Sequence, residues 1–293
     1  HYPLIIIQNQ TNKATINIMS TTIAIDLGGT NIRAARIEGY EIKQKIAVKC
    51  KANGQKHDVV QQLFDLVRQL MTPETEKIGI GVPSIIDHEK GVVYDVQNIP
   101  SWDIVPIKAL MEKEFSLPSA VDNDVNCFAL GEKHFGIGKQ YRNFVGITIG
   151  TGIGAGIVID GKLYRGSNTG AGEIGCLPYL NSDYEHYCSC QWMNKRGLNA
   201  LELSERAQRN DVEAIAIWEE FGRHLGKLLQ AILLTYDPEA IIIGGGITGG
   251  SDFFKTAMMQ SMASNFPYPK EIEHIHVHFS TLEDCGLLGA SRL

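Results

Sequence analysis

The feature that most constrains this 293-residue chain is an internal repeat. Residues 23–39 (IAIDLGGTNIRAARIEG) and 145–161 (VGITIGTGIGAGIVIDG) align without a gap at a constant offset of 122. Each copy has an apolar run, a glycine-rich turn, a second apolar run and a final tight turn, at Glu38-Gly39 and Asp160-Gly161. An acidic residue followed by glycine between two apolar runs predicts a hairpin. Two copies predict two similar lobes that each begin with a hairpin, the alternative being a chance likeness of two glycine-rich hairpins.

Helical and extended patterns alternate between the copies and after the second one. Apolar residues at helical spacing predict a helix capped by Asp58 and a long helix that begins at Asp211. Two more helices are predicted, from Pro106 to about Glu114 and after residues 122–124 through Phe135. This order is typical of an α/β protein whose parallel or mixed sheets are covered by helices. The predicted strands are Ile78–Val82, Ala120–Val121 and Ile241–Ile243.

Composition and charge exclude several classes of protein. The net charge is −6 and the pI is about 5.9, whereas proteins that bind a nucleic-acid backbone are usually basic. No apolar run approaches the ~18 residues of a membrane-spanning helix, and Leu4–Ile7 is too short for a signal-peptide core. Residues 1–19 are interpreted as an N-terminal extension, because the first 18 have no clear period and Met19 is a candidate start. We therefore expect a cytoplasmic protein that binds neither nucleic acid nor a membrane.

Three glycine-rich turns each follow an apolar run. Glycine lets a backbone approach a ligand closely and direct several N–H groups at one point, which suits a phosphate chain. Any one of these turns is equally well explained as an ordinary structural turn. None has the Gly-Lys-Ser/Thr of a P-loop, and GTGIGAG leads into a strand, unlike the turn of a dinucleotide-binding fold. Two related turns and a third one at a strand end therefore predict a site between the two lobes that binds the phosphates of a ligand.

Four motifs in a fixed order resemble one known family. They are IAIDLGGTNIR (23–33), VDNDVN (121–126), IGTGIGAG (149–156) and GAGEIG (170–175). Together they resemble the ROK family of bacterial sugar kinases and sugar-responsive repressors, in the actin-like, hexokinase-like ATPase superfamily. The resemblance implies two ribonuclease-H-like lobes with nucleotide and sugar in the cleft. It implies an N-terminal lobe of residues 20–121, joined by the C-terminal helix at 283–293, and a C-terminal lobe of residues 122–282.

The resemblance also implies roles for two aspartates. Asp124 would be the catalytic base that accepts the proton of the attacking sugar hydroxyl, since phosphoryl transfer needs positioning, charge neutralisation and a proton acceptor. The alternative for Asp122, Asn123 and Asp124 is to cap the helix that follows them. Asp26 would orient Mg²⁺ through water near the phosphates of ATP.

The remaining implied site residues fall into two sets. Asn98, Asn123, Asp124 and Glu173 would bind the sugar, with Asn98 alternatively a turn residue before Pro100. Arg33 is either a phosphate contact or an ordinary charge on a strand. The residues implied to bind the nucleotide are Gly28, Gly29, Thr30 and Asn31 in the first turn, Gly150, Thr151, Gly152 and Gly154 in the second, and Gly244, Gly245 and Gly246 in the third.

One region departs from the family pattern. ROK proteins often bind a structural zinc after the sugar-binding glutamate, but here Cys176 stands where the family has histidine and a third cysteine is missing after Cys188 and Cys190. A Cys₃His set that adds His186 remains an alternative, although we do not expect a structural zinc. We expect packing of Tyr179, Tyr184, Tyr187 and Trp192 to hold this loop. The departure also leaves open whether Glu185 or Glu202 is the second carboxylate that selects the sugar.

The function implied is ATP- and Mg²⁺-dependent phosphorylation of a hexose or N-acetylhexosamine, at the 6-hydroxyl, by a homodimer. Glucose, N-acetylmannosamine and N-acetylglucosamine are the candidate substrates. The alternative within the family is a sugar-binding repressor, which is disfavoured because only 25 residues precede Asp26, too few for a winged helix-turn-helix. An actin-like filament or chaperone ATPase is a third alternative, but it does not account for the VDNDVN and GAGEIG motifs.

Overall fold

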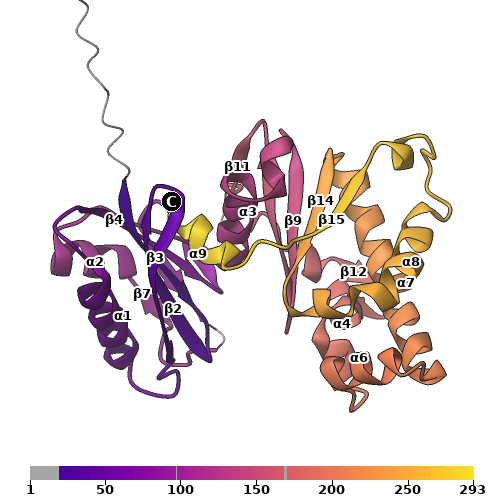
Figure 1. Ribbon diagram of the computed structural model, residues 1–293, viewed down its shortest axis with the longest axis horizontal. Helices are drawn as coiled ribbons and strands as arrows, with labels where there is room; N and C mark the ends of the chain where they lie inside the picture. The colour runs from indigo at the N-terminus through magenta and orange to yellow at the C-terminus, as the bar shows by residue number, and fades with distance from the viewer. Residues whose placement is uncertain (1–19, 97, 168–169) are drawn as a thin grey trace, which may run out of the picture.

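The computed structural model describes residues 20–96, 98–167 and 170–293, and the extension predicted at residues 1–19 lies outside them. Two five-stranded mixed sheets stand side by side in Figure 1. The first has the order β3-β2-β1-β4-β8, in which β1, β2 and β3 are antiparallel and β4 and β8 run parallel to β1. Its strands are β1 (Thr21–Leu27), β2 (Asn31–Glu38), β3 (Glu41–Lys49), β4 (Thr75–Val82) and β8 (Ser119–Asn123).

The second sheet repeats this arrangement strand by strand. Its order is β11-β10-β9-β14-β15, again with three antiparallel strands followed by two parallel ones. Both orders are those of a ribonuclease-H-like lobe, so the two similar lobes predicted from the repeat are confirmed. The strands are β9 (Phe144–Ile149), β10 (Ile153–Ile159), β11 (Lys162–Tyr164), β14 (Ala240–Gly244) and β15 (His276–Phe279).

The gapless alignment of the repeat is wrong by one residue. In the first hairpin Leu27 pairs with Ile32, whereas in the second Ile149 pairs with Ile153, so the second glycine turn is one residue shorter. Beyond the turn the two copies therefore correspond at an offset of 121, not 122. The far turns agree with this: the first lies at residues 39–40 and the second at residues 160–161. A shift of one residue matters because it changes which side chain lies on each face of the strand.

Helices α1 and α2 cover the outer face of the first sheet (Figure 1). Helix α1 spans Lys56–Leu70 and α2 spans Ile107–Phe115. The cap predicted at Asp58 is three residues late, because the helix is capped at Gln55 and Asp58 occupies the third helical position. Its carboxylate accepts the N–H of Gln55 over 2.7 Å and completes a capping box. The buried stripe of α1 is the one the sequence predicts.

Helices α7 (Val212–Tyr236) and α8 (Ser251–Ala263) cover the outer face of the second sheet. Asp211 caps α7 as predicted, accepting the N–H groups of residues 213 and 214. Trp218, Phe221 and Phe254 interlock in the core beneath these helices, with ring centroids 5.4–5.7 Å apart. Smaller helices at one end of this region are α4 (Tyr184–Cys188), α5 (Cys190–Asn194) and α6 (Ala200–Gln208).

Helices α3 (Asp124–His134) and α9 (Cys285–Ala290) lie between the two sheets in Figure 1. Their backbones are in direct contact: a Cβ on Gly289 would lie 1.6 Å from the carbonyl oxygen of Cys127. Helix α3 packs on β10 and β9, and α9 packs on β1, β4 and β2. The chain thus returns to the first sheet at its end, although the lobe limits 20–121 and 122–282 stay a prediction.

In the part of the chain that the structure describes, two small sheets and four 3₁₀ helices complete the architecture. The three-stranded sheet comes before the second glycine turn in the sequence, and Asn98 lies in the connection between two of its strands. The two-stranded sheet follows Glu173. No helix in the described ranges is long and apolar enough to cross a membrane. The strands are β5 (Ile85–Asp87), β6 (Val92–Tyr94), β7 (Ile104–Val105), β12 (Pro178–Tyr179) and β13 (Ser182–Asp183), and the 3₁₀ helices are η1 (Ile137–Gln140), η2 (Ile174–Cys176), η3 (Gly246–Gly250) and η4 (Glu271–Glu273).

Candidate active site

The three glycine turns follow the carboxyl ends of β1, β9 and β14. In the first turn the Gly28 N–H donates to the Asn31 carbonyl over 3.0 Å, and in the second the Gly150 N–H donates to the Gly152 carbonyl over 3.0 Å. The third turn packs directly on the end of β9, because a Cβ on Gly245 would lie 2.3 Å from the Ile149 carbonyl oxygen. In open α/β sheets the carboxyl ends of the strands are where ligands bind.

Gly154, which was grouped with the second turn, lies instead inside β10. A Cβ there would be 2.7 Å from a methyl group of Val125 in the first turn of α3. The glycine at this position is explained by packing of the helix, and the turn proper consists of residues 150–152.

Asp26 lies near the end of β1, with its side chain mostly buried. It forms an ion pair with Arg33, the residue directly opposite it on β2. A second group of charges lies beside this pair: Asp284 is 3.9 Å from Arg33 and accepts a hydrogen bond of 2.6 Å from Lys45. Arg33 therefore serves as the partner of Asp26 in this structure, and neither of its alternatives from the sequence describes it fully.

Asp124 is the first residue of α3, and its side chain is partly buried. Burial, followed by the charge of Asp26, raises the pKa of its carboxyl to about 6, against an opposing effect of backbone N–H groups at its own position and at Val125. The charge of Glu173 raises this pKa further. Three residues that are far apart in the sequence are thus brought within electrostatic reach of one another. A carboxyl with a raised pKa that faces other charged groups in a cleft is a candidate for acid–base chemistry.

The helix-cap interpretation applies to Asn123, not to Asp124. The Asn123 side chain accepts the N–H of Val125 over 2.8 Å, and its amide nitrogen donates to the Ser84 carbonyl over 3.1 Å. Asp122 is buried and accepts a hydrogen bond from Arg165. Because its neighbour makes the cap, the Asp124 carboxylate is not needed for one. The role of Asn123 in sugar binding stays a prediction.

Asn98 and Glu185 extend the site on its two sides. Asn98 lies against the first glycine turn, since a Cβ on Gly29 would be 2.1 Å from the Asn98 Cβ. On the other side Glu185 accepts the N–H of Ile153 over 3.0 Å, just past the second turn. Its charge, after burial, raises the pKa of Glu173, which places the two carboxylates near each other.

The structure therefore favours Glu185 over Glu202 as the partner of Glu173. Glu202 is an exposed residue of α6. No pattern in the sequence could have separated the two, because both follow a capping residue and both lie in the first turn of a short helix.

The cysteine-rich region does not form the Cys₃His arrangement. Within residues 20–96, 98–167 and 170–293, no three His, Cys, Asp or Glu side chains are grouped as ligands for a metal ion. Cys188 is fully buried whereas Cys176 is exposed, and Nδ1 of His186 lies 2.7 Å from an oxygen of Asp183. Burial raises the pKa of the Cys188 thiol well above its usual value, as expected for a thiol that packs as an apolar group.

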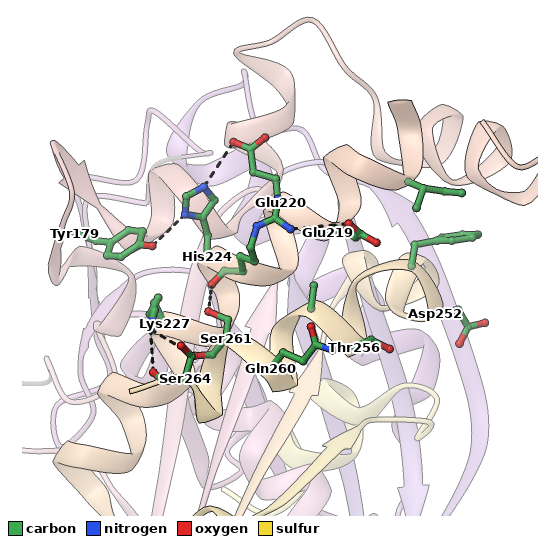
Figure 2. A pocket seen from close by; sticks show the side chains of 14 residues that line it. Tyr179, Glu219, Glu220, His224, Lys227, Asp252, Thr256, Gln260, Ser261 and Ser264 are labelled. Carbon is green, nitrogen blue, oxygen red and sulfur yellow. Dashed lines mark hydrogen bonds and ion pairs between the residues drawn. The ribbon is translucent and has the colours of Figure 1, made fainter. Parts of the chain in front are cut away.

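Aromatic rings hold this region against α7. Tyr179 stacks on Tyr184 with centroids 4.4 Å apart and meets the edge of Tyr187 at 5.3 Å. The Tyr179 hydroxyl lies 3.0 Å from Nδ1 of His224, whose other ring nitrogen lies 3.8 Å from a carboxylate oxygen of Glu220 (Figure 2). These residues line one end of a groove of about 980 Å³ between α7 and α8, which contains none of the site residues implied by the sequence.

The comparison with family models decides the relationship. A model of the ROK family matches residues 22–293. The chain belongs to the ROK family. This ROK protein is similar to the glucokinase of Thermotoga maritima, with 28% identity over 305 residues that cover 92% of this chain and 96% of the relative. It is also similar to the xylose repressor of Caldicellulosiruptor bescii, with 35% identity over 187 residues that cover 62% of this chain and 45% of the repressor.

The solved structures agree on the fold. A ROK family glucokinase from Streptomyces griseus, in complex with glucose and AMPPNP, superposes with a TM-score of 0.79 and 26% identity, covering 93% of this chain and 98% of that one. ROK sugar kinases have the actin-like ATPase fold, and the fold predicted from the sequence is confirmed.

Proposed function

We propose that this protein is an ATP-dependent kinase that phosphorylates a hydroxyl group, the 6-hydroxyl, of a hexose or N-acetylhexosamine. The observation that carries this proposal is the partly buried Asp124 carboxyl, whose pKa is raised to about 6 by burial and by the charges of Asp26 and Glu173. A sugar kinase needs a base near the acceptor hydroxyl, a carboxylate near the phosphates and hydrogen-bond acceptors for the sugar. The cleft supplies one group for each task.

Asp124 would act as the proton acceptor. A carboxylate with a pKa of about 6 is ionised at neutral pH and is more basic than an ordinary aspartate, which makes it a better general base. The side chain of Asp124 does not cap α3, because Asn123 is the N-cap residue. The proton leaves the sugar hydroxyl and is held on the Asp124 carboxylate while the hydroxyl oxygen attacks the terminal phosphorus.

Glu173, Glu185, Asn98 and Asn123 would bind the other sugar hydroxyls. Carboxylates that accept hydrogen bonds from two adjacent hydroxyls suit polyols, because a hydroxyl left without a partner in a dry site is costly. Glu185 contributes in a second way, since it fixes the N–H of Ile153 beside the second glycine turn. One side chain thus touches both the sugar region and the nucleotide region.

The residues present fit Mg²⁺ and ATP. After burial, the charge of Asp26 is the next cause that raises the pKa of Asp124, and a cation near Asp26 would offset that charge. Mg²⁺ prefers one or two carboxylates together with waters and phosphate oxygens, so Asp26 would hold it through water. When bound, the ion neutralises the negative charge of the phosphates. The N–H groups of the three glycine turns would bind the phosphates and the adenosine.

Similarity to the xylose repressor of C. bescii keeps a regulatory function as the second candidate. A repressor would bind a sugar and have no need of a carboxylate base in the cleft. The test is ADP release from ATP and Mg²⁺ with a panel of hexoses and N-acetylhexosamines, for the wild type and for Asp124→Asn. Sugar-dependent ADP release that the substitution abolishes supports the kinase, and sugar binding without ADP release supports the regulator.

We also propose that the lobes are residues 20–121 with 283–293 and residues 122–282, and that two chains form a homodimer. Light scattering on the purified protein measures the mass of the particle, and a mass of one chain at micromolar concentration contradicts the dimer.

A further inference from the structure

Arg165 connects the two sheets beneath the proposed sugar site. It follows directly after β11, at the edge of the second sheet. Its Nε donates a hydrogen bond of 2.5 Å to Asp122, which lies in β8 at the edge of the first sheet. The Asp122 side chain is only 4% exposed, so the carboxylate of this pair is almost completely shielded from water. This ion pair therefore joins an edge strand of the first sheet to the end of an edge strand of the second.

Asp122 is fixed firmly to the start of α3. Its other oxygen accepts the N–H of Asn123 over 2.8 Å and the side-chain amide of Asn126 over 2.7 Å. Asp124 stands two residues further along. Anything bound to Asp122 therefore has a defined position relative to the proposed base.

Arg165 also begins the segment that ends at Glu173. Close to Arg165, Gly166 is in contact with Ala171, since a Cβ on Gly166 would lie 3.1 Å from the Ala171 Cβ. At the far end the Gly172 carbonyl accepts the N–H of Ala155 over 3.0 Å, which attaches the segment to β10. On either side of residues 168–169, which lie outside the described ranges, Gly172 is thus held by the second sheet and Arg165 by Asp122 of the first.

We infer that Arg165 is a positioning residue that sets the distance between Glu173 and Asp124. A sugar held by Glu173 then presents its hydroxyl to the Asp124 carboxylate, and this inference rests on the proposed function. Buried ion pairs add little net stability, because the cost of removing two charges from water offsets their attraction. The value of this pair lies in its geometry: misplacement of reacting groups by about 1 Å costs about 100-fold in rate.

The experiment compares Arg165→Gln, directly after β11, with a matched control just before β9 of the same sheet. The control is Arg142→Gln, which removes an arginine whose partner Asp160 is 3.1 Å away and whose side chain is 72% exposed. We expect Arg165→Gln to lower kcat/KM for the sugar about 100-fold while KM for ATP stays near the wild-type value. Arg165→Lys, which keeps the charge, recovers part of the loss. Equal sugar kcat/KM in Arg165→Gln and Arg142→Gln overturns the inference.

A second variant separates positioning from simple loss of folding. Arg165→Gln leaves Asp122 buried without its charged partner, which lowers the melting temperature. In the double variant Asp122→Asn with Arg165→Gln that buried charge is gone, so we expect the melting temperature to recover and the sugar kcat/KM to stay low. Recovery of both together means that Arg165 acts on stability alone, and the inference is then wrong.

Hydrogen exchange gives a readout that does not need catalysis. In Arg165→Gln the amides of residues 170–176 should exchange faster than in the wild type, and those in the middle of α7 should not change. If the wild type phosphorylates no sugar, the proposed function fails, and the exchange result still decides whether Arg165 holds the Glu173 segment. Unchanged exchange at residues 170–176 overturns the inference by itself.

Discussion

The two hairpins of the repeat share one architecture but differ at a single decisive position. Opposite Asp26 on the first hairpin stands Arg33, whereas opposite Thr148 on the second stands Gly154. In the first copy this position supplies a cation to a carboxylate beside the nucleotide turn. In the second copy the glycine has no side chain at this position, and Val125 of α3 fills the space that a side chain would need.

That difference shows how a duplicated element divides its tasks. The first hairpin carries two charged side chains near its glycine turn, Asp26 on β1 and Arg33 on β2. The second hairpin has glycines where side chains would separate α3 from the sheet. A Cβ on Gly156, for example, would be 2.5 Å from the Ala129 Cβ. Close packing of α3 is what brings Asp124 to the cleft. The glycines of β10 therefore make room for α3, whereas those of the turn are the ones we propose to bind the nucleotide.

The largest expected effect tests whether the helix on the second hairpin carries the chemistry. Asp124→Asn keeps the shape of the side chain but removes the proton acceptor, so kcat should fall by ~10²–10⁴. Sugar and ATP binding, measured by calorimetry, should change little. Full activity in this variant would remove Asp124 from the mechanism.

The same substitution should make the protein more stable. The pKa of Asp124 is raised by burial and by Asp26 to about 6, so the folded protein binds this proton more tightly than the unfolded chain does. The stabilising contribution of the protonated form is fully present below the unfolded pKa of about 4 and is lost as the pH rises through 6. At pH 8 Asp124→Asn should therefore gain about 2–3 kcal/mol in the free energy of unfolding. Urea unfolding at pH 8 and at pH 4.5 measures this, and a gain that does not shrink at the lower pH contradicts it.

Two glycine substitutions sharpen the division between strand and turn. Gly154→Ala inserts a methyl group 2.7 Å from Val125 and should cost about 1–3 kcal/mol of stability, with a loss of kcat as α3 is displaced. Gly150→Ala, in the turn, points its methyl group into open space and should leave the melting temperature unchanged while raising KM for ATP. Thermal melts measure the stability of both variants, and steady-state kinetics measure their kcat and their KM for ATP. The reverse pattern would assign Gly154 to the nucleotide after all.

The pH dependence of kcat/KM should report the same base. Because Asp124 must be ionised to accept a proton, kcat/KM for the sugar is expected to be flat above pH 7 and to fall tenfold per unit below about pH 6. A profile that stays flat down to pH 5 is incompatible with the raised pKa of the base.

The smallest effect concerns the cation of the first hairpin. Arg33 is half exposed, and a surface ion pair contributes about 0–1 kcal/mol. Arg33→Gln should therefore change the free energy of unfolding by less than about 1 kcal/mol, and added salt should reduce the difference further. A larger destabilisation, measured by urea unfolding, would mean that the pair holds the hairpin together as α3 holds the second one.

Much of the fold was predictable because its signals are local. The stripe of α1, the cap of α7 at Asp211 and the apolar runs of the sheets depend on periodicities and end residues within one element. The approach of Asp124, Asp26 and Glu173 followed from a family resemblance in four ordered motifs. The one-residue shift between the hairpins was not predictable, because glycine matches glycine at either offset in the turn.

What the sequence missed depends on contacts between distant elements. Asn123 and Asp124 are equally good caps by composition, and only the backbone geometry selects Asn123. Glu185 is distinguished from Glu202 by its bond to Ile153, 32 residues away. The Asp122–Arg165 pair spans 43 residues and two sheets, and no local pattern marks either partner.

The return of the chain to its first sheet has a consequence for synthesis on the ribosome. Ala290 fills the space left by Gly79 on β4, and Arg292 donates a hydrogen bond of 2.6 Å to the carbonyl of Gly39 at the β2–β3 turn. Strands β1 and β4 therefore wait for residues 285–293 before their inner face is covered. While the second half is being translated, that face remains open to chaperones and to other nascent chains. Synthesis of residues 285–293, and not the emergence of the first hundred residues, is the event that lets the first sheet complete its packing.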